Sequence, residues 1–563
     1  MRELEKRNKE LLEEVEKLKR QVKTLKFRKK YGLVWEDEKE PEQIVLDCQV
    51  KIPILKEVKN KEIVTDKDKP QNILIEGDNY HSLSVLNYTH KKKIDVIYID
   101  PPYNTGNKHE WKYNDRWIDE NDEYKHSKWI NFMNIRLNLA KTLLSNRGVI
   151  FISIDEHEVA QLKLLCDSIF QEVNFCGIFV WQKKYGGGND SGQIATEHEY
   201  ILCYSNSPLN SEWLEPHDEK YLKRYKEEDK IGKFFWDTLE RPGLKNPIEV
   251  KLKFEGKEYV LKTFRSQKTV DEDLKSGEIR IVKLKNNKIS FQFKQRLKEG
   301  KKPRSLLQDK NGTSEEEGLL KIGSNASAKQ ELRDIFHKDI FNNPKPTTLV
   351  KYLIKLVGIK EGVVLDFFAG SGTTGHATAK LNSEESTNFK YILCTNNEDN
   401  NSDGLKIATD ICYPRIEKVI KGYKNLKDEQ IEGLGGNLRY FKSELWDIDH
   451  ISHVSDEQKI KLTYQAGDMI ALREGTFEEV EKDEWWQIFK DGTKYTAIYF
   501  KEDKKKLNEL VKKLSKLKEK VILYIFSWGK NEYKNEFTEY KNIKVEDIPE
   551  PIIDVYKEVN RLN

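Results

Sequence analysis

Two short, nearly continuous apolar runs, each ending in an aspartate, most constrain what this chain can fold into. They are IDVIYID (94–100) and VVLD (363–366). Unbroken apolar runs of this length are typical of parallel strands that are buried on both faces of a sheet. From residue 72 onward such strands alternate with helical patterns, so we expect an α/β fold with a doubly wound sheet. In such sheets ligands bind beyond the carboxyl ends of the strands, and Asp100 therefore stands where a catalytic group belongs.

The residues after the first run suggest what such a group would bind. Asp100 is followed by Pro101, Pro102 and Tyr103. Proline has no N–H and a fixed φ, so the two prolines end the strand and hold rigid carbonyl acceptors beside the carboxylate. Acceptors without a competing donor suit a planar amine, as on a nucleobase, and Tyr103 can stack on the ring that carries this amine. The same four residues are equally compatible with a strand that ends in an ordinary Asp-Pro turn.

The second run leads into a glycine-rich turn and a helix of small residues, DFFAGSGTTGHATAKL (366–381). Its glycines follow the pattern G-x-G-x-x-G and are Gly370, Gly372 and Gly375. This pattern lets a backbone approach a ligand at a helix N-terminus, and it also occurs at nicotinamide and flavin sites. A phosphate-binding P-loop is excluded, because His376 stands where that loop requires lysine. Asp366, before the first glycine, favours a ligand with a cationic amino group over a pyrophosphate.

Taken together, the two motifs resemble those of the amino-type DNA methyltransferases that use S-adenosylmethionine (AdoMet). Asp100–Tyr103 matches the catalytic DPPY of that family, and Asp366–Gly372 matches its cofactor-binding (D/E)xFxGxG signature. The catalytic motif comes first, which is the permuted order of the β class. Further phrases along residues 72–445 resemble, in the same order, the modification (Mod) subunit of type III restriction-modification systems. Among them are LIEGDNYHSL, FISIDEHE, EHEYILCYS, FNNPKPTTLVKYLI and YPRIEKVIKGY.

The resemblance implies catalytic roles for the first motif. Asp100 and the Pro101 carbonyl would accept hydrogen bonds from the N6 amine of a target adenine, with Pro102 holding the strand end rigid. Tyr103 would stack on the extruded adenine. Neither a metal nor a covalent enzyme intermediate is implied. The six cysteines form no CxxC pair, which also argues against a metal site.

The resemblance also implies a set of cofactor-binding residues. Asp366 and the backbone from Phe368 through Gly370 to Gly372, followed by Thr373, would hold the methionine moiety of AdoMet. The resemblance assigns three further residues less specifically. Asp78 would contact the cofactor's adenine, Lys345 would close over the methionine end, and Glu398 would bind the ribose hydroxyls. Each of these three is also compatible with an ordinary strand-end acid or a surface lysine.

The first thirty residues form a separate element. Leucines recur every seven residues, and Asn8, Val15 and Val22 fall between them in a 4-then-3 spacing; the leucines are Leu4, Leu11, Leu18 and Leu25. This pattern predicts a parallel two-stranded coiled coil over residues 1–30, and hence a homodimer. The alternative is an amphipathic helix that packs on its own chain.

The remaining chain divides into four predicted parts. Residues 31–180 and 335–445 are the catalytic and AdoMet-binding halves of the methyltransferase domain, and 181–334 is an inserted target-recognition domain. Within the insert, residues 245–304 carry 18 Lys and Arg against 8 Asp and Glu, a local charge of +10 in a chain of net charge +3. Such a surface suits the phosphates of double-stranded DNA. Residues 446–563 are expected to form a small α/β region without a catalytic motif.

Several functions are compatible with these features. The first is adenine-N6 methylation of DNA by the modification and recognition subunit of a type III system. No helicase or nuclease motif is present, so cleavage would need a separate restriction subunit. The alternatives are N4-cytosine methylation, an orphan adenine methyltransferase without a restriction partner, and a catalytically silent DNA-binding subunit. The sequence has neither a signal peptide nor an apolar run of membrane-spanning length, so we expect a cytoplasmic protein without a membrane partner.

Overall fold

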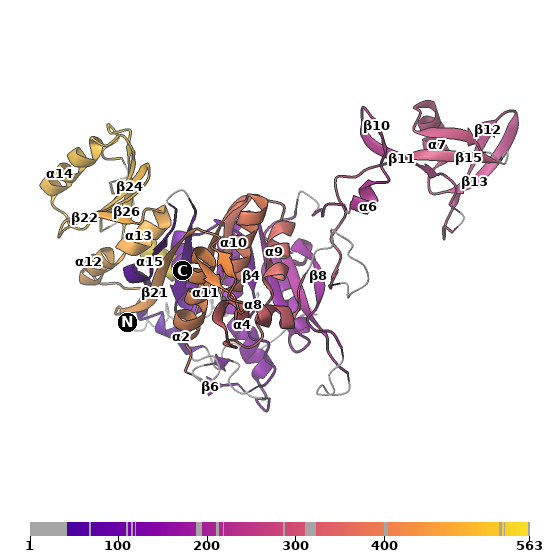
Figure 1. Cartoon of the computed structure of the whole chain (residues 1–563). Coiled ribbons are helices and arrows are strands. Elements are labelled where there is room, and N and C mark those ends of the chain that lie inside the picture. The colour runs from indigo at the N-terminus through magenta and orange to yellow at the C-terminus, as the bar shows by residue number, and fades with distance from the viewer. Residues whose placement is uncertain are drawn as a thin grey trace, which may run out of the picture. The chain divides into compact units, whose positions relative to one another are not determined.

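The computed structural model describes most of the chain from residue 42 to residue 560. The described ranges are 42–66, 69–107, 111–113, 116–118, 120–186, 194–209, 213–217, 219–241, 243–284, 288–309, 322–398, 404–528, 532–533 and 535–560. The predicted coiled coil at 1–30 lies outside them. The chain divides into two compact units (Figure 1), of which the second consists of Ser211–Arg304 and Lys310–Lys321, and the first of the remaining residues.

The first unit is built on a large mixed sheet. Its strands follow the order β1-β21-β3-β18-β17-β4-β7-β9-β8-β16, and β2 pairs with β21. The strands are β1 (Lys51–Glu57), β2 (Ile63–Val64), β3 (Gln71–Glu76), β4 (Ile94–Ile99), β7 (Leu144–Ile154), β8 (Phe175–Gln182), β9 (His198–Ser205), β16 (Leu306–Leu307), β17 (Glu361–Asp366), β18 (Asn388–Thr395) and β21 (Asn437–Asp447). The six strands from β21 to β7 are parallel, whereas β1 and β9 are antiparallel to their neighbours.

Helices cover this sheet and explain the unbroken apolar pattern of its central strands. All six residues of β4 are buried. Ile97 and Ile99 belong to the core cluster that includes residues of α3, α4 and α5, whereas Val96 and Tyr98 alternate onto the opposite face. The helices around this sheet are α2 (Gln43–Asp47), α3 (Asn79–Thr89), α4 (Lys125–Leu143), α5 (Val159–Phe170), α8 (Asn325–Phe336), α9 (Thr347–Leu356), α10 (Thr373–Glu385) and α11 (Tyr413–Lys421). The predicted doubly wound α/β fold is thus confirmed.

The centre of the sheet is the point from which the chain winds outward in both directions. Strand β17 pairs in parallel with β4, through Val364 opposite Val96 and Leu365 opposite Ile97. On one side β17 continues to β18, and on the other side β4 continues to β7. Such a switch point opens a crevice at the carboxyl ends of the two central strands, where ligands bind in folds of this kind.

The third glycine of the glycine-rich segment serves helix packing. A Cβ atom at Gly375 would lie 2.8 Å from Cδ1 of Ile416 on α11 and 2.9 Å from Cδ1 of Leu393 on β18. Any larger side chain at this position would push α10 away from the sheet, because both neighbours belong to the packed interior. The glycine therefore fixes how closely the helix approaches the sheet.

The C-terminal region forms an α/β module on a second sheet, in the order β22-β23-β24-β25-β26. Its elements are α12 (Asp456–Gln465), α13 (Gly467–Glu474), β22 (Glu478–Lys482), β23 (Trp486–Asp491), β24 (Lys494–Tyr499), α14 (Lys504–Ser515), β25 (Lys520–Phe526), β26 (Ile543–Ile548) and α15 (Glu550–Val559). Residues of α13 and α15 share one hydrophobic cluster with α3 and β1. The module therefore shares a core with the large sheet and is part of the first unit.

The second unit is a small β-rich body with its own core. Strands β10 (Glu227–Asp229), β11 (Gly232–Thr238), β15 (Ile289–Arg296) and β14 (Ile279–Lys283) form one sheet, and β12 (Ile248–Phe254) and β13 (Lys257–Thr263) form a hairpin. Helices α6 (Glu219–Leu222) and α7 (Gln267–Lys275) complete the unit. Strands β14 and β15 are antiparallel, as their alternating sequence predicts. The predicted turn at Asn286–Asn287 lies outside the described residues.

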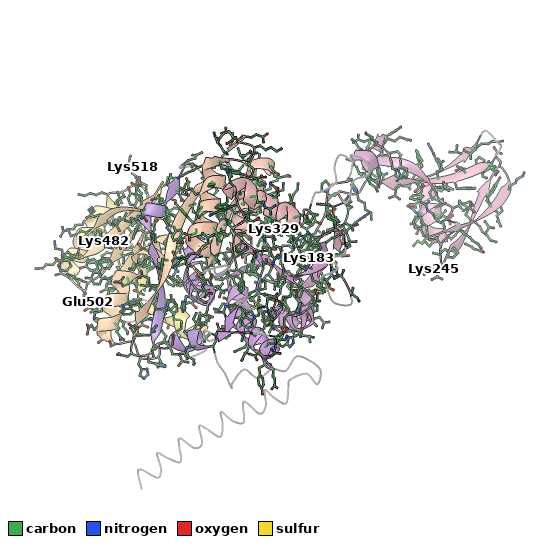
Figure 2. All side chains as sticks on the ribbon, turned by 60° about the horizontal axis from the view of Figure 1, so that its bottom comes forward. Lys183, Lys245, Lys329, Lys482, Glu502 and Lys518 are labelled. Carbon is green, nitrogen blue, oxygen red and sulfur yellow. The ribbon has the colours of Figure 1, made fainter. Side chains whose placement is uncertain are left out.

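The second unit lies inside the range 181–334 that the sequence assigns to target recognition, but it is shorter. Strand β9 pairs with β7 and β8, and helix α8 also lies in the first unit. Figure 2 shows the side chains of the described parts of both units, with Lys245 in the second unit and Lys183 and Lys329 in the first. None of the helices in the described ranges combines the length and the apolar composition that a membrane crossing needs.

Because α15 and the large sheet share a core, we predict that a substitution in α15 destabilises the first unit. Ile553 is 1% exposed, so Ile553→Ala is expected to lower the free energy of unfolding by about 2–5 kcal/mol. Glu558→Ala, on the exposed face of the same helix, removes only a surface ion pair with Lys91 and is expected to cost at most about 1 kcal/mol. Chemical denaturation measures both; equal losses would contradict the shared core.

Candidate active site

The two aspartates that end the apolar runs lie at the carboxyl ends of neighbouring strands. Asp366 is the last residue of β17, and Asp100 directly follows β4. Since these strands pair in parallel, both carboxylates stand at the same edge of the sheet, at its switch point. The structure thereby brings the two sequence motifs together.

The carboxylate of Asp100 is held by two side chains. The Lys345 ammonium donates hydrogen bonds to Oδ1 and Oδ2 of Asp100, each at 2.8 Å. The Tyr103 hydroxyl donates to Oδ1 at 2.7 Å. The Asp100 side chain is 27% exposed and that of Lys345 only 6%. The carboxylate of this ion pair is therefore partly open to solvent, whereas the lysine is buried.

A second carboxylate, Glu199 on β9, completes this group. Its Oε2 lies 3.3 Å from the Lys345 ammonium and 3.0 Å from the Tyr103 hydroxyl, and its Oε1 accepts from Lys183 at 3.3 Å. Sequence reasoning missed Glu199. The sequence feature that could have indicated Glu199 is an acid beside His198 at the start of an apolar strand, in EHEYILCYS.

Burial and mutual attraction set the protonation of this group. Burial raises the pKa of Asp100 above its usual range, although the Lys345 ammonium opposes the shift. Burial also acts to raise the pKa of Glu199, but Lys345 and Lys183 bring it below its usual value. Burial acts to lower the pKa of Lys345, but the two carboxylates raise it overall. Lys345 and Glu199 therefore remain charged at neutral pH.

The two prolines are fixed by their surroundings. The Pro102 carbonyl accepts a hydrogen bond from Nε1 of the buried Trp129 at 2.7 Å. Within the described ranges no group donates to the carbonyl of Pro101, which is itself buried. Trp111, in the loop after the motif, is buried against Phe132 and donates to Asn104. Trp111 therefore acts in packing at this strand end.

The turn before α10 requires glycine at two positions. Gly370 has φ +49° and Gly372 has φ +81°, conformations that favour glycine. Added Cβ atoms there would lie 3.1 Å from Phe341 and 3.1 Å from the Cys412 thiol, respectively. Gly372 is the N-cap of α10 and supplies no capping side chain, so the first turn of this helix presents backbone N–H groups.

Asp366 is nearly enclosed beside this turn, with 3% of the residue exposed. Its Oδ1 accepts from the Phe368 backbone N–H at 3.0 Å, and its Oδ2 accepts from the Thr374 hydroxyl at 2.5 Å. Burial raises the pKa of Asp366 to about 7, against the effect of these two bonds. The carboxyl group is therefore poised to change charge near neutral pH. The Phe368 ring packs on Phe132 and Phe367.

Thr373 joins the glycine-rich segment to Lys345. Its hydroxyl lies 3.3 Å from the Lys345 carbonyl and accepts from the Arg415 guanidinium at 2.9 Å. Arg415 is fully buried and also contacts the Ser371 hydroxyl at 2.9 Å. It is a further residue that sequence reasoning missed, because an arginine within YPRIEKVIKGY reads as part of a solvated helix face.

Asp78 and Glu398 lie at the ends of neighbouring strands. Asp78 is the N-cap of α3, accepts from the Tyr80 backbone N–H at 2.6 Å and lies 3.7 Å from the Arg136 guanidinium. Glu398 is exposed three residues beyond β18, and its carbonyl accepts from the Ile407 N–H at 3.1 Å. Their predicted contacts with a cofactor stay predictions.

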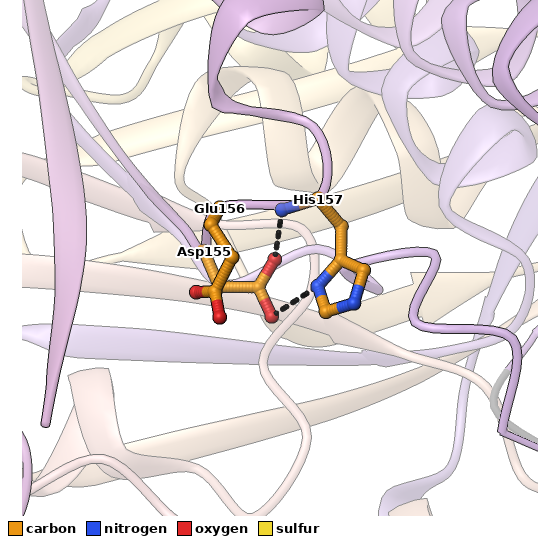
Figure 3. A group of neighbouring side chains, drawn as sticks. All are labelled: Asp155, Glu156 and His157. Carbon is orange, nitrogen blue, oxygen red and sulfur yellow. Dashed lines mark hydrogen bonds and ion pairs between the residues drawn. The ribbon is translucent and has the colours of Figure 1, made fainter. Parts of the chain in front are cut away.

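Asp155, Glu156 and His157 form a compact group directly after β7 (Figure 3). Asp155 accepts hydrogen bonds from the backbone N–H and from Nδ1 of His157, both at 3.0 Å. Glu156 and His157 are exposed. The two bonds within the turn account for the Asp155 carboxylate without an ion.

Comparison with known proteins identifies the family. The model of the N6/N4-type DNA methylases, described as DNA methylase, matches residues 94–406, a span that contains both strand-end motifs. The chain belongs to the N6/N4 DNA methylase family.

Among its relatives are modification enzymes of two types. The chain is 34% identical over 397 residues to the type III restriction-modification enzyme StyLTI Mod subunit of Salmonella typhimurium, a match that covers 65% of this chain and 59% of that protein. It is 30% identical over 402 residues to the type II methyltransferase M.KpnI of Klebsiella pneumoniae, covering 65% of this chain and 91% of that one. The chain thus spans about three-fifths of the length of the StyLTI subunit.

A solved structure also matches this chain. The DNA modification methylase TTHA0409 of Thermus thermophilus, complexed with S-adenosyl-L-methionine, shares 14% sequence identity with a TM-score of 0.28. The match covers 57% of this chain and 88% of that chain.

We predict that Asp366 makes the stability of the protein depend on pH. Its pKa is about 7 in the folded protein and 3.8 for an ordinary aspartate. The folded state therefore binds the proton more tightly, and its stability falls as the pH rises from about 4 to about 7. Asparagine does not titrate, so Asp366→Asn removes this loss. The free energy of unfolding of the variant minus that of the wild type should therefore be about 2–3 kcal/mol larger at pH 8 than at pH 5.

Urea denaturation of both proteins at the two pH values measures that difference. A gain that is the same at pH 5 and pH 8 would contradict the raised pKa of Asp366.

Proposed function

We propose that this protein transfers a methyl group from AdoMet to N6 of an adenine that is extruded from double-stranded DNA. The observation that carries the proposal is the placement of Asp100, followed directly by Pro101, one strand away from Asp366 and the glycine-rich turn. One strand end offers acceptors for an amine, and its neighbour offers a space for an amino-acid ligand.

The residues of the glycine-rich turn fit the methionine moiety of AdoMet. A carboxylate oxygen accepts up to two hydrogen bonds, and each oxygen of Asp366 accepts one within the chain, so capacity remains for a cationic ammonium. The first turn of α10, capped only by Gly372, suits the carboxylate of the same moiety. A Cβ atom at Gly370 would meet Phe341 and one at Gly372 would meet the Cys412 thiol, so the turn keeps its conformation only with glycine at both positions. Phe368, Thr373, Asp78, Lys345 and Glu398 are proposed as further contacts.

The chain's own groups orient the amine for reaction. When bound, AdoMet supplies a methyl group activated by a positively charged sulfur. Asp100 and the Pro101 carbonyl accept the two N–H bonds of the adenine amine and thereby direct its nitrogen towards the neighbouring strand end. Tyr103 stacks on the extruded adenine and limits its position. Positioning and electrostatic stabilisation of the developing positive charge provide most of the catalysis.

The second unit and its flanks are proposed as the target-recognition domain. Residues 245–304 carry a local charge of +10, which favours DNA phosphates. In the described part of this unit, Arg280 lies 4.2 Å from the centre of the Trp236 ring. Lys294 and Arg296 lie within 6 Å of the Phe234 ring and also form ion pairs with Asp229 and Glu278. Basic groups interleaved with aromatic rings on one sheet suit a nucleic-acid partner.

The assembly is proposed from the resemblance to Mod subunits. The relative StyLTI is a Mod subunit of a type III restriction-modification enzyme. By analogy this chain would be the modification and recognition subunit, would dimerise through residues 1–30 and would need a separate restriction subunit for cleavage. Adenine is favoured over cytosine because Asp100 stands where N4-cytosine enzymes more often have serine.

We predict that the purified protein transfers labelled methyl groups from AdoMet to adenine in duplex DNA, and that Asp100→Ala lowers the rate by about 100-fold or more. Binding of AdoMet to the Asp100→Ala variant should remain unchanged, which isothermal titration calorimetry tests as the control. Digestion of the product DNA to nucleosides identifies the labelled base. Label on cytosine, or no label with any DNA, would refute the proposal.

We also predict that AdoMet binding depends on pH through Asp366. The cofactor's ammonium needs the ionised carboxylate, whose pKa is about 7 in the free protein. The Kd should therefore rise by about tenfold for each pH unit below 7 and level off above pH 8. Calorimetry measures the Kd across this range, with Asp366→Asn as the matched control that binds weakly at every pH. A Kd that is constant between pH 5.5 and pH 8 would exclude Asp366 as the ammonium partner.

A further inference from the structure

The acceptor that a target amine needs is already occupied within the chain. The Lys345 ammonium donates to both oxygens of Asp100 at 2.8 Å. Oδ1 of Asp100 already accepts from both Lys345 and Tyr103, so an adenine amine must share Oδ2 with the ammonium or replace it there. The neutral amine thus competes with a buried positive charge, which forms the stronger, charge-assisted hydrogen bonds.

A displaced ammonium cannot be left without a partner. Lys345 is 6% exposed, and an unpaired charge in such a place is strongly destabilised. The only other carboxylate that forms an ion pair with Lys345 in the described ranges is Glu199, at 3.3 Å and 7% exposed. A shift of about 0.5 Å would shorten this contact to a normal ammonium–carboxylate bond.

The surroundings of Glu199 fit this second position. Lys183 binds Oε1 of Glu199 at 3.3 Å and leaves Oε2 directed towards Lys345 and Tyr103. The Tyr103 hydroxyl has a single hydrogen and lies within bonding distance of both carboxylates, at 2.7 Å from Asp100 and 3.0 Å from Glu199. The Tyr103 hydroxyl can therefore donate a hydrogen bond to one of the two carboxylates whether the ammonium binds Asp100 or Glu199.

Resting on the proposed function, we propose that Glu199 is a positioning residue that receives the Lys345 ammonium when the target amine takes its place on Asp100. In the free enzyme Lys345 holds both oxygens of Asp100 and thereby fixes the orientation of this carboxylate. When the base enters, the ammonium moves to Glu199, and the two lysines and two carboxylates remain balanced in charge throughout.

The test compares Glu199→Gln with the matched control Glu197→Gln, which lies two residues earlier on the chain. The probes are two duplexes with the recognised site, one with adenine at the target position and one with purine, which lacks the 6-amino group. In the wild type the adenine duplex should bind more tightly than the purine duplex. In Glu199→Gln the Lys345 ammonium stays on Asp100. The preference for the adenine duplex over the purine duplex should therefore fall at least about fivefold, and the single-turnover methylation rate should fall at least about tenfold. Glu197→Gln should behave as the wild type.

Removing Lys345 separates a positioning role from a merely structural one. In a Lys345→Met background no ammonium needs a second partner, so adding Glu199→Gln should change the adenine preference by less than about twofold. An equal loss of preference in both backgrounds, or no loss in Glu199→Gln alone, would overturn the inference. A wild-type protein that labels no adenine at all would instead refute the proposed function. Unchanged AdoMet affinity confirms that Glu199→Gln and Glu197→Gln are folded, and a wild-type circular dichroism spectrum confirms it for the variants that carry Lys345→Met.

Discussion

The parallel pairing of β17 with β4 determines where everything else in the site must lie. The two strands come from distant parts of the chain, yet they share the centre of the sheet and end at the same edge. Because strand ends are far more rigid than loops, the two aspartates and the segments that follow them have a fixed relation. The glycine-rich turn, the start of α10 and the Asp100–Tyr103 strand end are all consequences of this one pairing.

Around this centre charged side chains are largely buried, and each forms an ion pair or hydrogen bonds with its neighbours. Asp100 and Glu199 face Lys345, and Glu199 also faces Lys183. A buried ion pair adds little net stability, because desolvation offsets most of the attraction, but the loss of one partner is costly. Such a group therefore specifies one arrangement of β4, β9 and the segment before α9. Within the described part of the chain, Asp366 has no cationic partner of this kind and accepts hydrogen bonds from a hydroxyl and a backbone N–H instead. These neutral donors offset burial less than a lysine would, so the pKa of Asp366 stays near 7.

The sequence was sufficient for the parts of the site that follow directly from strands. Unbroken apolar runs predicted buried parallel strands, and an acid at the end of such a run can point only towards the crevice, so Asp100 and Asp366 were found correctly placed. Lys345 was singled out by resemblance, but its partner Glu199 was not, because β9 joins the sheet only through long-range antiparallel pairing with β7. No local pattern encodes that pairing. Arg415 was missed for a similar reason, since its burial depends on the packing of α11 against α10.

The connection between the two units has a consequence for how such proteins can diversify. Most of the second unit, Ser211–Arg304, is inserted between β9 and β16, and β8 lies between these two strands at one edge of the first sheet. Its core is separate and consists of its own side chains, including Val250, Phe291 and Phe293. Replacing the insert would leave the strands that carry Asp100 and Asp366 untouched. With the second unit as the proposed target-recognition domain, exchange of this one insert would change the sequence preference and leave the residues proposed for the chemistry in place.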